Sequence, residues 1–173
     1  MANILRLKRS DVAGRMPGLA DLEPGELAVN THDGRLFLKK DNGTASIVDV
    51  TAANATGSIG FLIDGGGAPI TPGVKGTIVV PFDCTITSWT LMADQAGSVV
   101  LDLWKASFAN YPPSIANSIT ASAKPTITAD MKAFSATLTS WTVAIAAGDI
   151  LAFNVDAASA ITRVSVGLTV TRL

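Results

Sequence analysis

The sequence predicts an all-β protein, with a small N-terminal hairpin segment followed by an antiparallel, jelly-roll-like β-sandwich. Three observations support this prediction. Of the 173 residues, 48% are hydrophobic and only 16% are charged, which leaves too few charges for a typical helical surface. Short runs in which apolar and polar residues alternate recur along the whole chain. Turn-forming Gly, Pro, Asn and Asp residues separate these runs.

The charged residues divide the chain into two halves. Residues 1–50 hold 14 of the 27 Asp, Glu, Lys and Arg residues, and the longer remainder holds the other 13. Between the halves lies the stretch TAANATGS, which is small, polar and without an apolar period. We therefore expect an N-terminal segment at 1–50, a linker at 51–57 and a C-terminal β-sandwich domain at 58–173.

The N-terminal segment is expected to form about four short strands. The first lies in NILRLKRS, the hairpin in GELAVNTHDGRLFLKK with Asp33-Gly34 in its turn, and the last strand in ASIVDV. Burying the few aliphatic side chains of this hairpin does not offset the entropy of ordering its backbone. We therefore expect the same hairpin of sister chains to supply the missing cover. The expected oligomerisation residues are Leu27, Val29, Leu36, Phe37 and Leu38.

The C-terminal half contains eight or nine strand-like runs spaced roughly 8–12 residues apart, the pattern of a sandwich or jelly roll. A turn is expected at DQAG, between CTITSWTLMA and SVVLDLWKA. Alternation places Trp89 and Trp141 in the core. The stretch TADMKAFSATL is open to two interpretations, a strand or one helical turn. The runs are SIGFLID, KGTIVV, CTITSWTLMA, SVVLDLWKA, KAFSATL, WTVAI, ILAFNVD and RVSVGLTVTRL.

Composition excludes several classes of partner. The net charge is −1 and the pI is about 5.7, so we expect no binding of nucleic acid or of acidic membranes. No segment has the character of a secretory signal. Uncharged runs such as 106–123 contain Pro112-Pro113 and many hydroxyl residues, so we expect no membrane insertion and synthesis in a cytoplasm. The single cysteine, Cys84, lies in a strand-like run and is expected to be a buried free thiol.

The chain offers little catalytic chemistry. Its only histidine, His32, lies in the hairpin turn, so one chain cannot assemble a zinc site or a nucleophile–histidine pair. A glycosidase needs two carboxyl groups at a defined separation, and the C-terminal half has seven Asp and no Glu. We expect no catalytic residues, no metal and no cofactor, with a glycan-degrading enzyme as a third-ranked alternative.

Aromatic residues provide a candidate binding site. In SVVLDLWKA, alternation separates Val99, Leu101 and Leu103 from Asp102 and Trp104, and the second set is expected to face outward. Aromatic ring faces and nearby polar groups suit saccharides. Alternatively, Trp104 packs against a neighbouring subunit or beneath its own loop. The candidate receptor patch consists of Trp104, Asp102, Asn110 and Tyr111.

The N-terminal pattern LKRS…AGRMPGLADLEPGELAVNTHDGRLFLKKDNG resembles the start of many bacteriophage tail-fibre and receptor-binding proteins. This likeness covers about the first 50 residues. The segments DGGGAPITPGVKG, WTLMADQAGSVVLDLWK and NYPP are similar to a β-sandwich module at the C-terminal ends of phage fibre proteins. The matching N-terminal residues are Leu22, Gly25, Glu26, Leu27, Ala28, Asn30, Asp33, Gly34, Leu36, Phe37, Lys39 and Gly43.

The resemblance implies a virion protein that is made in the host cytoplasm and assembles as a homotrimer. Residues 1–50 would contact other virion structural proteins, and the sandwich would contact a saccharide or protein on the host surface. A purely structural role as a head fibre, capsid decoration or tail adaptor is the alternative.

Overall fold

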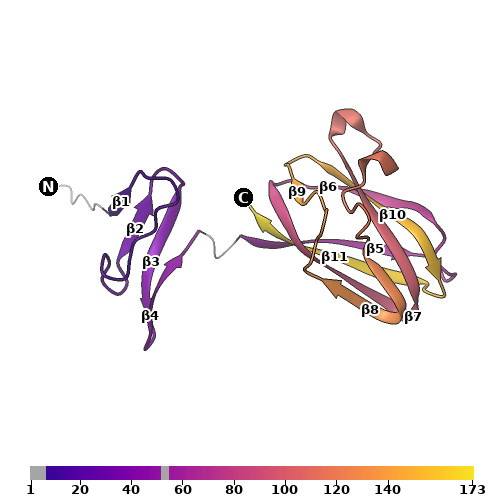
Figure 1. The fold of residues 1–173 in the computed structure, drawn as a ribbon, viewed down its shortest axis with the longest axis horizontal. Helices are drawn as coiled ribbons and strands as arrows, with labels where there is room; N and C mark the ends of the chain where they lie inside the picture. The colour runs from indigo at the N-terminus through magenta and orange to yellow at the C-terminus, as the bar shows by residue number, and fades with distance from the viewer. Residues whose placement is uncertain (1–6, 52–54) are drawn as a thin grey trace. The chain divides into compact units, whose positions relative to one another are not determined.

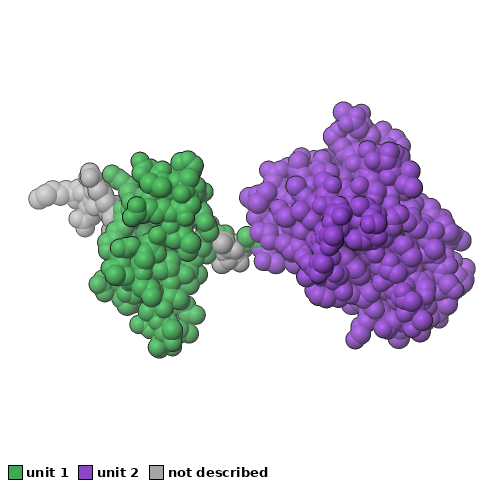
Figure 2. Space-filling view, in the orientation of Figure 1, with its two compact units in different colours: residues 1–55 green, residues 56–173 purple. Residues whose placement is uncertain are grey.

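The structure, a computed structural model, describes residues 7–51 and 55–173, which belong to two compact units (Figures 1 and 2). The first unit ends at Ala55 and the second comprises Thr56–Leu173. The described residues contain strands and two short 3₁₀ turns but no α-helix, which confirms the all-β class. The expected linker began at Thr51 and ended at Gly57. Strand β5 instead begins at Thr56, and residues 52–54 lie outside the described ones.

The N-terminal unit is a four-stranded sheet with the order β1-β2-β3-β4. Strand β1 runs parallel to β2, and the other neighbouring strands are antiparallel. The expected hairpin is β2–β3, and Gly34 in its turn has φ of +66°, a conformation that glycine adopts at little cost. The first residues of the expected N-terminal strand lie outside the described ones. The strands are β1 (Lys8–Ser10), β2 (Leu27–Asn30), β3 (Arg35–Asp41) and β4 (Ala45–Asp49).

The sandwich unit is one seven-stranded sheet in which β5-β11-β7-β10-β6 are neighbours and β8 and β9 also pair with β7. Of the segment that allowed a helical turn, residues 128–135 belong to strand β8. The bounds are β5 (Thr56–Asp64), β6 (Gly73–Val79), β7 (Cys84–Ala106), β8 (Thr126–Ser135), β9 (Ala144–Ile145), β10 (Ile150–Ser159) and β11 (Arg163–Arg172).

Strand β7 corrects one sequence prediction. The DQAG segment at 94–97 is not a turn but continues the strand, so that β7 is 23 residues long. Asp94 Oδ1 accepts hydrogen bonds from the backbone N–H groups of Thr162 (3.2 Å) and Arg163 (3.0 Å). The segment is therefore held to the β10–β11 connection. Such long-range contacts override the local turn preference of Asp and Gly.

The sheet curls on itself because the first half of β7 pairs with β11 and the second half with β10. A register shift of the β7–β8 ladder between Met92 and Gly97 lies where β7 passes from β11 to β10. Phe61 of β5 stacks on Phe153 of β10, with ring centroids 4.3 Å apart, although these strands are not neighbours in the sheet. The space between the two halves holds one apolar cluster, which includes Trp89 and Trp141 as predicted.

Candidate functional site

Asn30 is the polar centre of the N-terminal unit. The residue is 1% exposed, and its amide nitrogen donates to the carbonyl oxygens of Val12 (2.8 Å) and Arg15 (3.0 Å). The same nitrogen lies 2.9 Å from Asp33 Oδ2, so its two hydrogens are shared among three acceptors. Buried polar groups are normally hydrogen-bonded. The hydrogen bonds of this amide hold the loop after β1 against the hairpin.

Asp33 completes this arrangement from the hairpin turn. Its carboxylate accepts a hydrogen bond from Gly14 N at 2.7 Å and lies 2.9 Å from His32 Nδ1. Hydrogen bonds from His32 and then from Gly14 lower the pKa of the Asp33 carboxyl. The Asn and Asp of the fibre-like pattern therefore have a structural role within one chain.

Three apolar residues of the same pattern lie on the loop-covered face of the sheet. Phe37 (1% exposed), Leu22 (2%) and Ala28 (6%) form a small cluster, with Ile47 packed against it. Phe37 was expected among the oligomerisation residues, and this expectation was wrong. Phe37 pairs with Ala28 across the hairpin, so its ring faces the opposite side from Leu36 and Leu38 and is buried by its own unit.

The other four expected oligomerisation residues share the opposite face. Leu27 is opposite Leu38, which is opposite Val48, and Val29 is opposite Leu36. All five side chains remain partly exposed. We call this set the aliphatic face; it consists of Leu27, Val29, Leu36, Leu38 and Val48.

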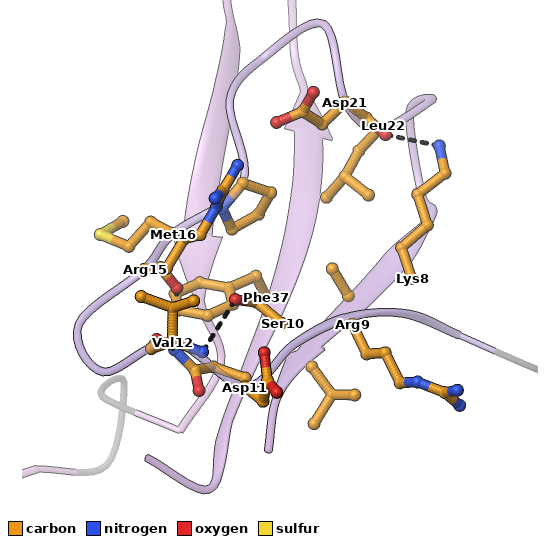
Figure 3. Close-up of a pocket in the computed structure, with 14 residues that line it drawn as sticks. Lys8, Arg9, Ser10, Asp11, Val12, Arg15, Met16, Asp21, Leu22 and Phe37 are labelled. Atoms are coloured by element: carbon orange, nitrogen blue, oxygen red, sulfur yellow. Dashed lines mark hydrogen bonds between the residues drawn. The ribbon is translucent and has the colours of Figure 1, made fainter. Parts of the chain in front are cut away.

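A pocket of about 570 Å³ lies between β1, the loop that follows it and the sheet (Figure 3). Its lining includes the basic side chains of Arg9 and Arg15 and the acidic side chains of Asp11 and Asp21. Lys8 at its margin is already paired, with its Nζ 2.9 Å from Glu26 Oε2. The mixture of charges gives the pocket no single ligand preference.

In the sandwich unit, Val99, Leu101 and Leu103 face the core as predicted, each 1% exposed or less. Asp102 lies on the opposite face but is 0% exposed, so the expectation that it belongs to a surface patch was wrong. The physical reason is that the chain between β7 and β8 returns along this strand and covers it. Ile119 N donates to Leu103 O at 2.8 Å on this path.

The Asp102 carboxylate is held by three groups from that returning segment. Ser118 Oγ and Thr120 Oγ1 each donate to Oδ1 at 2.6 Å. Lys124 Nζ lies 3.1 Å from Oδ2 and also contacts Asp156 Oδ2 at 2.6 Å. The result is a buried ion pair with a second, partly exposed carboxylate outside it.

These contacts set the ionisation of the cluster. Burial disfavours the charged form of Asp102, but hydrogen bonds from Ser118, Thr120, Trp104 and Lys124 together outweigh it. The pKa of the Asp102 carboxyl therefore lies below its usual value. The hydrogen bond to Asp156 raises the pKa of the Lys124 ammonium. Asp102 is therefore a charged anchor at neutral pH and is enclosed on the side where a ligand would approach.

The other three residues of the expected patch have different environments. Trp104 is partly buried, forms a bridge with Ser118, and has a buried indole nitrogen that helps to lower the pKa of the Asp102 carboxyl. Asn110 and Tyr111 are exposed on the loop itself, and Tyr111 is 55% exposed. The structure thus places Trp104 beside the loop base and only Asn110 and Tyr111 on the outer surface.

Strand alternation alone did not indicate Ser118, Thr120 and Lys124. An aspartate inside the apolar run SVVLDLW was a signal that a partner was needed, since buried carboxylates are paired. The sequence did not show which segment would supply that partner.

Two features are absent from the part of the chain that the structure describes, a metal-binding cluster and a membrane-spanning helix. No group of three or more His, Cys, Asp or Glu side chains is arranged to hold a metal ion there. Within the same residues, no helix is both long and apolar enough to cross a membrane. Cys84 is buried and free, and its burial raises the pKa of the thiol.

Comparison with known proteins gives little information on function. No family model and no curated protein matches the sequence. A chain from a structure of infectious bursal disease virus, Gx strain, is similar over 78% of this chain, with 10% identity and a TM-score of 0.29. RmlC from Streptococcus suis, solved in complex with dTDP-D-xylose, is similar over 80%, with 9% identity and a TM-score of 0.23. The matches span 38% of the viral chain and 64% of the RmlC chain. Both TM-scores are too low to assign a function.

Proposed function

We propose that this protein is a non-enzymatic structural component of a bacteriophage virion, a trimeric fibre protein that contacts the host surface through its sandwich unit. The N-terminal unit would join the three chains and contact other virion proteins. The fibre-like pattern of the first 50 residues supports the class of protein and the threefold assembly. The aliphatic face is the observation that carries the proposal.

The aliphatic face of the N-terminal sheet is only partly covered. The unit covers one side of its sheet with its own loop and leaves five aliphatic side chains partly exposed on the other. Each such side chain contributes up to about 1.5–3 kcal/mol when it is fully buried. Two further copies of the same face can bury these residues, since identical chains associate through self-complementary or cyclic contacts.

The test is the mass of the full chain in solution. Sedimentation velocity should show a three-chain assembly, and Leu36→Asp should shift it to monomer, because the new carboxylate would be buried in the interface. Leu19→Asp is the matched control, since Leu19 lies in the loop of the same unit and is 48% exposed. A wild-type chain that remains monomeric at micromolar concentration would overturn the proposal.

A purely structural role without a receptor is the second candidate. The burial of Asp102 and the partial burial of Trp104 favour it, because they remove half of the expected receptor patch from the surface. Antibody labelling of intact particles of the encoding phage would separate the two: a free fibre tip supports attachment, and a position within the capsid surface supports decoration.

A further inference from the structure

The loop between β7 and β8 exposes more apolar surface than a free loop normally does. Phe108 is 83% exposed, Ile115 68% and Tyr111 55%, all within Ser107–Asn117. This segment, which we call the loop tip, forms the projection at the top of the sandwich unit (Figures 1 and 2). Exposed apolar residues that share one short segment are candidates for an interaction site.

The loop tip is held in one conformation by local hydrogen bonds. Asn110 Nδ2 donates to Ser107 Oγ at 3.0 Å, and Asn110 N to Ser107 O at 3.0 Å. Ser114 N donates to the Asn117 side chain at 2.9 Å, and together these two residues form a capping box around the second 3₁₀ turn. Pro112 and Pro113 restrict the backbone between these two turns. A surface that is already ordered loses less entropy on binding.

The base of the loop is fixed by the buried carboxylate described above. Ser118 follows the loop tip directly and, like Thr120, donates to Asp102 Oδ1 at 2.6 Å. Breaking these contacts would leave the buried carboxylate without its partners, which costs free energy. The arrangement therefore ties the projecting segment firmly to β7, so that exposed rings are presented from a rigid support.

The chemistry of the segment identifies the kind of partner. No charged residue occurs in 106–123, so the surface offers nothing to a strongly charged ligand. Its exposed groups include two aromatic rings and an aliphatic side chain interspersed with the amides of Asn110 and Asn117. Ring faces suit the C–H faces of sugar rings, and amides suit their hydroxyl groups. A lipid surface would favour cationic residues around the apolar ones.

We propose that the loop tip is a binding site for neutral saccharides, with Phe108 and Tyr111 as stacking platforms and Asn110 as a polar contact. This inference rests on the proposed attachment function and replaces Asp102 and Trp104 of the sequence-based patch with Phe108 and Ile115. Three copies in one assembly would raise a weak single-site affinity through avidity.

The test uses the full chain and immobilised neutral oligosaccharides of hexoses and N-acetylhexosamines, measured by biolayer interferometry. Binding to at least one of these glycans is expected, unchanged between low and high salt because no ion pair is involved. The double variant Phe108→Ala/Tyr111→Ala should weaken it at least tenfold. Phe134→Ala is the matched control, since Phe134 is 66% exposed on β8, and it should bind like the wild type.

Several outcomes would overturn the inference. These are binding to none of the neutral glycans, equal binding by the double variant and the wild type, preference for acidic glycans, and adsorption to phosphatidylcholine–phosphatidylethanolamine vesicles instead. Sedimentation velocity of the same samples distinguishes failure of the saccharide site from failure of the proposed trimer. A trimer that binds no neutral glycan would overturn only the saccharide site, whereas a monomer would overturn the proposed assembly and leave glycan binding as a separate result.

Discussion

The two units of this chain cover their sheets in different ways. In the sandwich unit, 23 apolar residues form one buried cluster, because the curled sheet places its two halves face to face. In the N-terminal unit the corresponding cluster contains Leu22, Ala28 and Phe37, and a buried asparagine holds the covering loop. A sheet closed on itself thus buries its own apolar face, whereas a small sheet with one covering loop leaves its second face partly exposed.

Among the variants below, Phe37→Ala is expected to lower the free energy of unfolding most, in the N-terminal unit. Loss of this ring should cost about 3–5 kcal/mol, comparable to the whole stability of so small a unit. Amide exchange of the full chain, read separately for each unit, should show lost protection in β2 and β3 and unchanged protection in the sandwich. Leu19→Ala is the control. Retained protection in β2 and β3 would contradict the view that this small cluster orders the unit.

A smaller effect is expected from Asp102→Asn in the sandwich unit. The variant loses the charge that pairs with Lys124 and weakens two charge-assisted hydrogen bonds, which should cost about 2–3 kcal/mol. All three tryptophans lie in the sandwich, so urea unfolding followed by tryptophan fluorescence reports on this unit alone. Asp130→Asn, at an exposed position, is the control.

The pH dependence of the free energy of unfolding tests whether the charge of Asp102 stabilises the sandwich. Because the folded-state pKa of Asp102 is lowered, its carboxylate stabilises the sandwich above the ordinary aspartate pKa. That contribution is lost as the pH falls through the lowered value. The stability difference between wild type and Asp102→Asn should therefore shrink below about pH 4. A constant difference down to pH 2 would show that the charge is not the stabilising feature.

The smallest effect is expected from Gly97→Ala, which tests how tightly the sandwich is closed. A Cβ atom at this position would lie 2.8 Å from Ile161 Cγ1 and would also meet the Ser159 carbonyl oxygen. Such overpacking typically costs about 1–3 kcal/mol. Gly60→Ala is the matched control because its Cβ meets nothing closer than 3.9 Å, and it should change stability by less than about 0.5 kcal/mol. Equal free energies of unfolding for the two variants, measured with urea, would mean that strand β7 accommodates a methyl group at position 97 without cost.

Much of the fold could be predicted because alternation and turn residues act locally. The hairpin around Gly34 and the inward face of Val99, Leu101 and Leu103 follow from periods of two residues and from positive φ. The turn expected at 94–97 was wrong because the side chain of Asp94 binds a distant connection instead of its own backbone turn. Two residues of the candidate patch, Asp102 and Trp104, are not on the outer surface for a similar reason. A segment further along the chain covers Asp102.

By itself, the sequence determined the all-β class, the division into two parts and the two faces of each strand, because these depend on neighbouring residues. Only the tertiary structure decided which face is covered. It placed Phe37 inside and Leu36 on the open side, and it enclosed Asp102 beneath Ser118 and Thr120. Covering a face requires side chains from distant segments, and strand alternation carries no information about where those segments pack.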